Sequence, residues 1–149
     1  MAESTGEDLL LAVLVQGFNS STDPESSASI TLTVAGLVVS GDLVPAWVWF
    51  RDMRAVLTSG SGTGADGMAG VFGMFADDAL GEVLIREATG EVEDAEVASG
   101  PAAGATLPTT IHLARAVILG AHHHQELAGG LWRGRLSHVS GWTFGRFEP

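Results

Sequence analysis

Apolar and polar residues alternate along residues 29–34, with the apolar positions on one face and threonines on the other. This period of two predicts a half-buried β-strand, and residues 37–44 return as its partner in a hairpin. Ala35 and Gly36 form the turn between the two strands. Because alanine is a poor residue for positive φ, we expect a type I turn in which only Gly36 is left-handed.

A second group of strands is predicted near the C-terminus. Residues 109–119 are apolar on both faces, which is typical of a strand in the centre of a sheet. Two more strand-like runs follow the predicted loop 120–130, and Ser140 and Gly141 between them indicate a tight turn. The sequence therefore predicts a second hairpin at the end of the chain.

The predicted C-terminal hairpin brings arginines onto one face. A two-residue turn places Arg135 opposite Arg146, with Arg133 next on the same face. Like charges opposed on neighbouring strands repel, so we expect this face to meet an acidic partner. Tryptophan and arginine are also favoured anchors of protein interfaces, although the aromatic residues here can equally be core. The candidate partner-binding residues are Trp132, Arg133, Arg135, Trp142, Phe144 and Arg146.

Helices are predicted on both sides of the first hairpin. Residues 7–18 carry apolar side chains at helical spacing, and Gly17 is the expected stop. Pro45 suits the first position of a second helix over residues 46–58. The broad aromatic face of this second helix predicts that it covers an open end of the sheet.

The middle of the chain has a different composition. Residues 59–75 are Gly-rich but keep apolar residues at helical spacing, which predicts a linker that runs into a weak amphipathic helix. Residues 82–98 are acidic and fit either a helix with a tail or a hairpin. We expect one domain over residues 1–149 with a flexible Gly-rich and acidic insertion at about 59–108. The predicted fold class is α+β, a small bent antiparallel sheet or open barrel of about five strands with two to three helices.

Charge narrows the range of partners. The net charge is −11, and all seven cationic residues are arginines. Nucleic acids and anionic membrane surfaces require clustered positive charge, so we expect neither as a partner. No apolar run reaches the roughly 18–20 residues of a membrane span. Acidic residues precede the short apolar run 9–15, which argues against a secretory signal, and we expect a cytoplasmic protein.

Three patterns suggest chemistry, and each has a simpler explanation. His122, His123 and His124 are metal-ligand types, but adjacent residues of an extended loop do not easily face one ion, so we expect no metal site. Residues 62–67 spell G-x-G-x-x-G, yet a helix precedes them where a dinucleotide site requires a strand. His112 alternates with apolar neighbours, which indicates a structural, partly buried histidine. We expect no cofactor and no enzymatic activity.

Several segments together resemble one known family. The predicted first helix ends in Gly17-Phe18, and residues 30–41 approximate the hairpin pattern I-x-L-x-V-x-G-x-V-x-S-G. An I-H-L segment lies at 111–113 and a W-R-G-R segment at 132–135. These segments are similar to those of the gas vesicle accessory protein GvpU. The order of helix and hairpin also resembles Sm-type small barrels, whose RNA-binding function does not follow from fold alone.

The resemblance to GvpU implies a cytoplasmic, non-enzymatic accessory protein that acts in gas vesicle assembly or in clustering between vesicles. Its partners would be gas vesicle shell proteins, other gas vesicle accessory proteins or further copies of itself as a homo-oligomer. We expect weak, multivalent contacts, in which the acidic segment 77–96 of one protomer pairs with Arg133, Arg135 and Arg146 of another or of a shell protein. The alternative is a generic protein-interaction or scaffold module with no link to gas vesicles.

Overall fold

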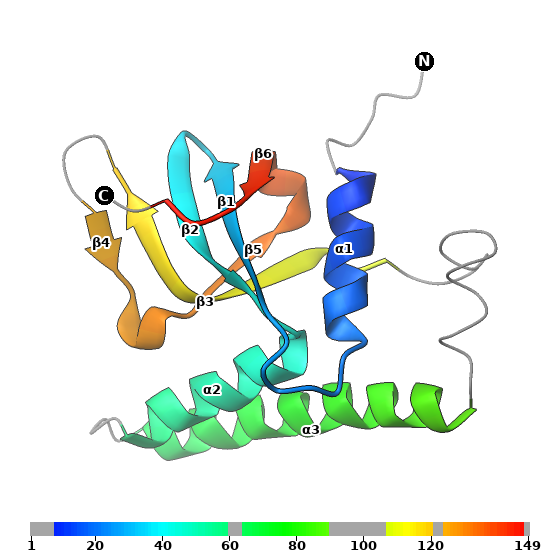
Figure 1. The fold of residues 1–149 in the computed structure, drawn as a ribbon. Coiled ribbons are helices and arrows are strands. Elements are labelled where there is room, and N and C mark those ends of the chain that lie inside the picture. Colours follow the sequence, from blue (N-terminus) through cyan, green and yellow to red (C-terminus); the bar gives the residue numbers. More distant parts are fainter. Residues whose placement is uncertain (1–7, 60–63, 90–106, 121–123, 148–149) are drawn as a thin grey trace.

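The computed structural model describes residues 8–59, 64–89, 107–120 and 124–147. Over these residues the chain forms three α-helices, six β-strands and two short 3-10 turns (Figure 1). In chain order they are α1 (Leu9–Asn19), β1 (Ala28–Val34), β2 (Leu37–Leu43), α2 (Ala46–Ser59), α3 (Ala65–Thr89), β3 (Thr110–Leu119), β4 (His124–Glu126), η1 (Ala128–Gly130), β5 (Trp132–Arg135), η2 (Leu136–His138) and β6 (Val139–Phe144).

The strands pair antiparallel in a single sheet of order β4–β3–β2–β1–β6. The strand β5 pairs with the first half of β3, on the same edge as β4. The turn η2 then carries the chain from this edge to β6 at the opposite end of the sheet, so the sheet curls into a half-barrel (Figure 1). The predicted α+β class, with a bent antiparallel sheet and two to three helices, is confirmed.

The predicted C-terminal hairpin is wrong. Ser140 and Gly141 lie inside β6, which pairs with β1, while β5 pairs with β3. Arg135 is therefore opposite Thr110, and not opposite Arg146. The physical reason is that Leu136 at the bend is almost fully buried in the core, which turns the chain away from a local hairpin. The free edge of β1 then pairs with β6 through backbone hydrogen bonds, with one irregularity between Thr33 and Val34.

The first hairpin forms as predicted, but its turn type does not. Val34 pairs with Leu37, so the loop between the strands has two residues. Both of these have positive φ, 51° for Ala35 and 80° for Gly36, which makes a type I′ turn. The right-handed twist of the strands favours this turn, and the preference outweighs the strain of an alanine in the left-handed region.

The first two helices begin and end close to their predicted limits. The Asp8 carboxylate accepts from the Leu11 backbone N–H at 3.2 Å and caps α1, which runs through the predicted stop at Gly17. Pro45 precedes α2, and the Asn19 side chain accepts from the first N–H of that helix at 2.9 Å. This hydrogen bond joins the end of α1 to the start of α2.

The Gly-rich segment forms more helix than its composition predicts. The helix α3 is 25 residues long and lies beside α2 across one end of the sheet (Figure 1). Burial of its inner face against α2 stabilises the helix despite its glycines. Residues 60–63 and 90–106 lie outside the described residues, so the flexible insertion and the acidic tail remain predictions.

Two apolar clusters form the core. The first joins α1 to one face of the sheet and contains Leu11, Ala12, Val15, Ile30, Leu32, Val39, Leu43, Ile111, Leu113, Ala116, Leu136 and Val139. The second lies between the sheet end and the helix pair and contains Val44, Trp47, Val48, Trp49 and Leu131. Partly buried residues of α3, among them Phe72, Ala79 and Leu80, pack against the second cluster.

Candidate functional site

Two of the six candidate partner-binding residues lie at the junction of α1 and β6. The Trp142 indole N–H donates to Asp8 at 2.7 Å and so connects β6 to the cap of α1. This hydrogen bond, helped by the one from Leu11, lowers the pKa of the Asp8 carboxyl. The rings of Trp142 and Phe144 meet edge to face with their centroids 5.4 Å apart. The hydrogen bond holds Trp142 beside the start of α1, and Phe144 packs against Trp142.

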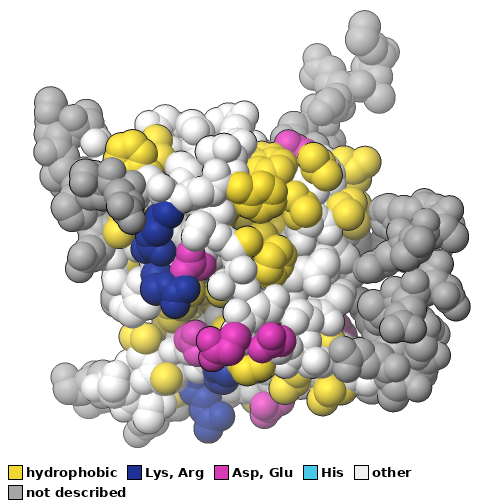
Figure 2. Space-filling model, in the orientation of Figure 1, with side chains coloured by type: hydrophobic (Ala, Val, Ile, Leu, Met, Phe, Trp, Pro, Cys, Tyr) yellow, Lys and Arg dark blue, Asp and Glu magenta, His cyan; other side chains and the backbone are white. Residues whose placement is uncertain are grey.

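The helix α1 is apolar on its outer side as well as on its inner side. Leu11, Ala12 and Val15 are buried in the first core cluster, whereas Leu9 and Leu10 are 62% and 61% exposed. Figure 2 shows apolar side chains gathered over this helix and β6. We call this surface the α1–β6 patch, and its members are Leu9, Leu10, Val13, Trp142 and Phe144.

Arg146 lies in a separate cluster around a buried carboxylate. Asp42 on β2 is only 4% exposed and accepts from the Ser29 hydroxyl at 3.0 Å. It also forms ion pairs with Arg115 of β3 and, at 3.4 Å, with Arg146. Arg146 further donates to the backbone carbonyl of Arg115. The structure therefore gives Arg146 an intramolecular partner, away from the other two candidate arginines.

The sequence interpretation missed Asp42 and Arg115, although both left a signal. Each is the single charged residue of its predicted strand, and a carboxylate that a strand buries, as Asp42 is, is almost always paired. Arg115 also has a positive φ of 48°, at the irregularity where β3 shifts its register against β2. This backbone conformation cannot be foreseen from residue type, because arginine rarely adopts it.

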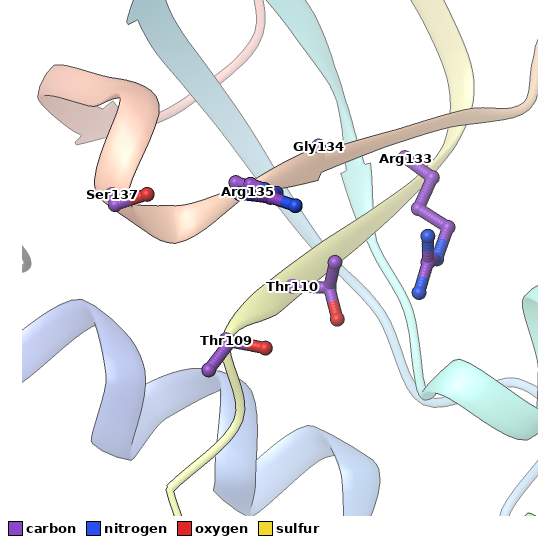
Figure 3. Close-up of a pocket in the computed structure, with 6 residues that line it drawn as sticks. All are labelled: Thr109, Thr110, Arg133, Gly134, Arg135 and Ser137. Atoms are coloured by element: carbon purple, nitrogen blue, oxygen red, sulfur yellow. The ribbon is translucent and has the colours of Figure 1, made fainter.

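Arg133 and Arg135 remain together, on the pairing between β3 and β5. Arg135 is opposite Thr110 and Arg133 is opposite His112, so all four side chains lie on one face of this strand pair. A pocket of about 500 Å³ opens beside them. Its lining residues are Thr109, Thr110, Arg133, Gly134, Arg135 and Ser137 (Figure 3). We call this the β3–β5 pocket.

His112 holds one of these arginines. The Arg133 Nε–H donates to His112 Nε2 at 3.1 Å, and its guanidinium lies 6.0 Å above the centre of the Phe50 ring. The imidazole is 3% exposed, with the Trp49 and Phe50 rings 5.3 and 5.5 Å away. Burial, reinforced by the charge of Arg133, lowers the pKa of His112 to about 3. The imidazole is therefore neutral at physiological pH.

A neutral His112 that accepts at Nε2 must carry its proton on Nδ1. Within the described part of the chain this Nδ1 atom has no hydrogen-bond partner, and neither has the buried Trp49 indole N–H. The sequence predicts a satisfied, partly buried histidine, whereas the imidazole is almost fully buried and only one of its ring nitrogens is paired by a described residue. The paired nitrogen is the one that contacts Arg133.

Comparison with known proteins identifies the family. A family model described as gas vesicle protein GvpU-like matches residues 8–147. The chain belongs to the GvpU-like gas vesicle protein family. The match includes the α1–β6 patch, the Asp42 cluster and the β3–β5 pocket. Neither the curated proteins nor the solved structures contain a match to this GvpU-like chain.

Trp132, the remaining candidate of the GvpU-like chain, packs against the first core cluster and is half-buried. A side chain at Gly134 would collide with its indole, so glycine at that position lets the ring fold back along β5. Trp132 thus shapes the strand that carries Arg133 and Arg135.

The described residues of this GvpU-like protein contain no group of three His, Asp or Glu side chains placed to share a metal ion. His122 and His123 lie outside those residues, and His124 begins β4. No helix in the described ranges has the length and apolarity to cross a membrane. The part of the G-x-G-x-x-G segment that is described leads into α3 and follows α2, so it lacks the preceding strand of a dinucleotide site.

Proposed function

We propose that this GvpU-like protein is a non-enzymatic accessory protein that acts in gas vesicle assembly or clustering through weak, multivalent contacts with gas vesicle proteins. Membership of the family supports the link to gas vesicles. The exposed α1–β6 patch supports a role in protein binding, and it is the observation on which the proposal depends.

The α1–β6 patch has the chemistry of a protein contact. A helix that is apolar on all sides is typical of a buried element, yet the outer side of α1 faces solvent. Contiguous exposed apolar surface on a folded protein marks interaction sites. Trp142 adds an aromatic anchor that is already oriented by its hydrogen bond to Asp8, so binding would order few additional side chains.

The charged part of the proposed contact is carried by fewer residues than the sequence suggests. Arg146 is already paired with Asp42, which leaves Arg133 and Arg135 as exposed cations of the candidate set. Exposed Asp77 and Asp78 on α3 are acids that a second copy can present to them. One exposed ion pair contributes only about 0–1 kcal/mol, so many copies on a vesicle must act together.

A reaction centred on His112 is disfavoured by its environment. A general base works best with a pKa near the operating pH, whereas the pKa of this imidazole is about 3. Its accepting nitrogen is also occupied by Arg133. We therefore propose no catalytic step for this chain and no cofactor.

Flotation of the purified protein with gas vesicles tests the proposal. We expect the wild-type protein to float with vesicles and Leu9→Gln/Leu10→Gln to lose at least about tenfold in apparent affinity, because two anchors of the patch become polar. The matched control is Met68→Gln/Met74→Gln, which changes two equally exposed apolar residues on α3.

Three outcomes would decide against the proposal. Binding that survives Leu9→Gln/Leu10→Gln would remove the α1–β6 patch as the contact. Loss in the α3 control alone would move the contact to that helix. Failure of the wild-type protein to bind vesicles would favour the generic interaction module.

A further inference from the structure

We propose that the β3–β5 pocket is a binding site for a phosphoryl oxyanion, held by Arg133 and Arg135 with the hydroxyl groups of Thr109, Thr110 and Ser137. This site lies on a different surface from the α1–β6 patch and would bind a small anion without vesicles. It shares Arg133 and Arg135 with the charged part of the proposed contact, but the binding of a small anion by the purified protein can succeed or fail whether or not the protein binds vesicles.

The pocket concentrates hydrogen-bond donors. Its two guanidinium groups carry five N–H donors each, and its three hydroxyl groups can each donate one more. One donor is already used, since Arg133 Nε–H bonds to His112, and this leaves the terminal nitrogens of Arg133 free of that bond. No carboxylate lines the pocket, although the whole chain has a net charge of −11. Such a lining suits an anion.

The donors lie in a row along β5, the turn η2 and the start of β3 (Figure 3). Arg133 and Arg135 are two residues apart on β5, so their Cα atoms are separated by about 7 Å and their side chains share a face. Figure 3 shows the Thr110 side chain between those of the two arginines. The carbonyl of Thr109 accepts from the Leu136 N–H at 2.9 Å, which ties the turn η2 to the start of β3. That turn carries Ser137 to the far side of the pocket.

Arg133 is held in position before any ligand binds. Its Nε–H donates to His112, and its guanidinium lies 6.0 Å above the centre of the Phe50 ring. Because the imidazole is neutral, it does not repel the positive charge of Arg133. For the same reason it is not a second cation that could bind the anion in place of Arg133. Burial of His112 is unfavourable because its Nδ1 has no partner among the described residues. In return, the buried imidazole provides the acceptor that holds Arg133.

Arg135, in contrast to Arg133, is not held in position by other side chains of the described residues. It is exposed, and no described residue forms an ion pair or hydrogen bond with its side chain. Two cations on neighbouring positions of one strand face repel each other when the pocket is empty. A bound anion between them would remove this repulsion. The pairing of one oriented and one adaptable arginine is thus suited to closing on a small ligand.

The number and arrangement of the donors favour a phosphoryl group over a carboxylate. The two oxygens of a carboxylate lie in one plane, and the fork of a single arginine satisfies them. A phosphoryl group has three terminal oxygens that point in different directions and can accept from both arginines and from the hydroxyls. The same chemistry is found in inorganic phosphates and in phosphorylated metabolites.

Isothermal titration calorimetry at constant ionic strength tests the site with inorganic phosphate, pyrophosphate, a nucleoside diphosphate and succinate. We expect saturable binding of pyrophosphate by the wild-type protein and at least tenfold weaker binding by Arg135→Gln. Thr110→Val, which removes a hydroxyl but keeps a strand-forming residue, should weaken binding about threefold or more. Arg51→Gln is the matched control, because it removes one exposed arginine on α2 that pairs with Asp52.

The four ligands separate the outcomes. Tighter binding of pyrophosphate assigns the site to free phosphates, and tighter binding of the nucleoside diphosphate assigns it to phosphorylated metabolites. Succinate binding as strongly as pyrophosphate would overturn the phosphoryl assignment. Equal affinity in Arg135→Gln, Arg51→Gln and wild type would overturn the site itself.

The positioning role of His112 has its own readout. His112→Gln keeps an acceptor for the Arg133 Nε–H, and we expect its pyrophosphate affinity to stay within threefold of the wild-type value. His112→Leu removes the acceptor and should weaken binding tenfold, with the circular dichroism spectrum unchanged. Weakening that is equal in the two variants would overturn this role.

Discussion

The protonation state of a single residue in this protein depends on its burial more than on its residue type. His112 is an ordinary titratable side chain in the sequence, but the second core cluster surrounds it with Trp49 and Phe50. The low-polarity environment disfavours the imidazolium form, and the adjacent Arg133 adds repulsion. The result is a histidine that acts as a neutral hydrogen-bond acceptor.

This environment predicts a pH-dependent stability. In the unfolded chain His112 binds a proton below about pH 6.5, whereas in the folded chain its pKa is about 3. The unfolded state therefore binds more protons between these values, and stability is lost as pH falls. Urea unfolding should show a decrease of about 2 kcal/mol in unfolding free energy between pH 7 and pH 5 from this group.

The variant His112→Gln should lack this component of the pH dependence. His138→Gln, which changes an exposed histidine, should retain it. Identical pH profiles for wild type and His112→Gln would show that the burial of the imidazole does not control the profile.

At the scale of elements, the segment 145–147 after β6 covers the polar face of β1 and β2. Phe147 donates its backbone N–H to the buried Ser40 hydroxyl at 2.8 Å, and the Gly145 carbonyl accepts from Thr31 at 2.8 Å. Arg146 between them pairs with Asp42. The polar face of β1 and β2 is thus covered by the chain end through specific bonds, not by an apolar layer.

This arrangement predicts that Asp42 is important for stability. Asp42→Ala should reduce the unfolding free energy by about 2–4 kcal/mol, since it removes a buried carboxylate and leaves Ser29, Arg115 and Arg146 without their partner. Asp52→Ala is the control because it breaks only the exposed pair with Arg51, and it should cost under about 1 kcal/mol. Equal costs in urea unfolding would contradict the structural role of Asp42.

The accuracy of the element predictions followed the range of the interactions involved. The hairpin of β1 and β2 was predictable because its alternation of apolar and polar residues and its turn are local. Pro45 and the aromatic face of α2 likewise predicted that helix. The turn at Ser140 and Gly141 was mispredicted because β6 pairs with β1, more than one hundred positions earlier in the chain. The residue types at a turn give no information about a competing strand so far away in the sequence.

At the scale of the whole molecule, charge is distributed so that copies can attract as well as repel. The chain has a net charge of −11, yet Arg133 and Arg135 share one exposed strand face. Acidic residues on α3 are exposed elsewhere on the surface. Attraction between such surfaces is short-ranged at physiological salt, where the Debye length is about 8 Å.

The proposed clustering of vesicles by this protein should therefore depend on salt. We expect wild-type clustering, measured by light scattering, to fall several-fold between about 0.1 M and about 1 M NaCl, where the Debye length is roughly 3 Å. Arg133→Glu/Arg135→Glu should cluster less at low salt and respond weakly to added salt. Clustering that is unchanged by salt in the wild-type protein would leave the apolar patch as its cause.

The binding role of the candidate residues stays a prediction, but part of their placement was predictable. Trp142 and Phe144 were selected from residue type, and alternation along β5 correctly placed Arg133 and Arg135 on one face. Their grouping with Arg146 depended on a hairpin that does not form. Leu9, Leu10 and Val13 were predicted to lie on a helix but not to be exposed. Periodicity alone does not show which side of an all-apolar helix is covered.

Residue order alone was enough for the α+β class, the first hairpin, the central strand β3 and the likeness to GvpU, because each depends on periodicity or on short segments. The partners of β5 and β6, the neutral state of His112 and the ion pairs of Asp42 required the folded chain. These features arise from contacts between segments distant in sequence and from burial, which changes the energy of a charge by several kcal/mol. Neither effect is encoded in the local pattern of residues.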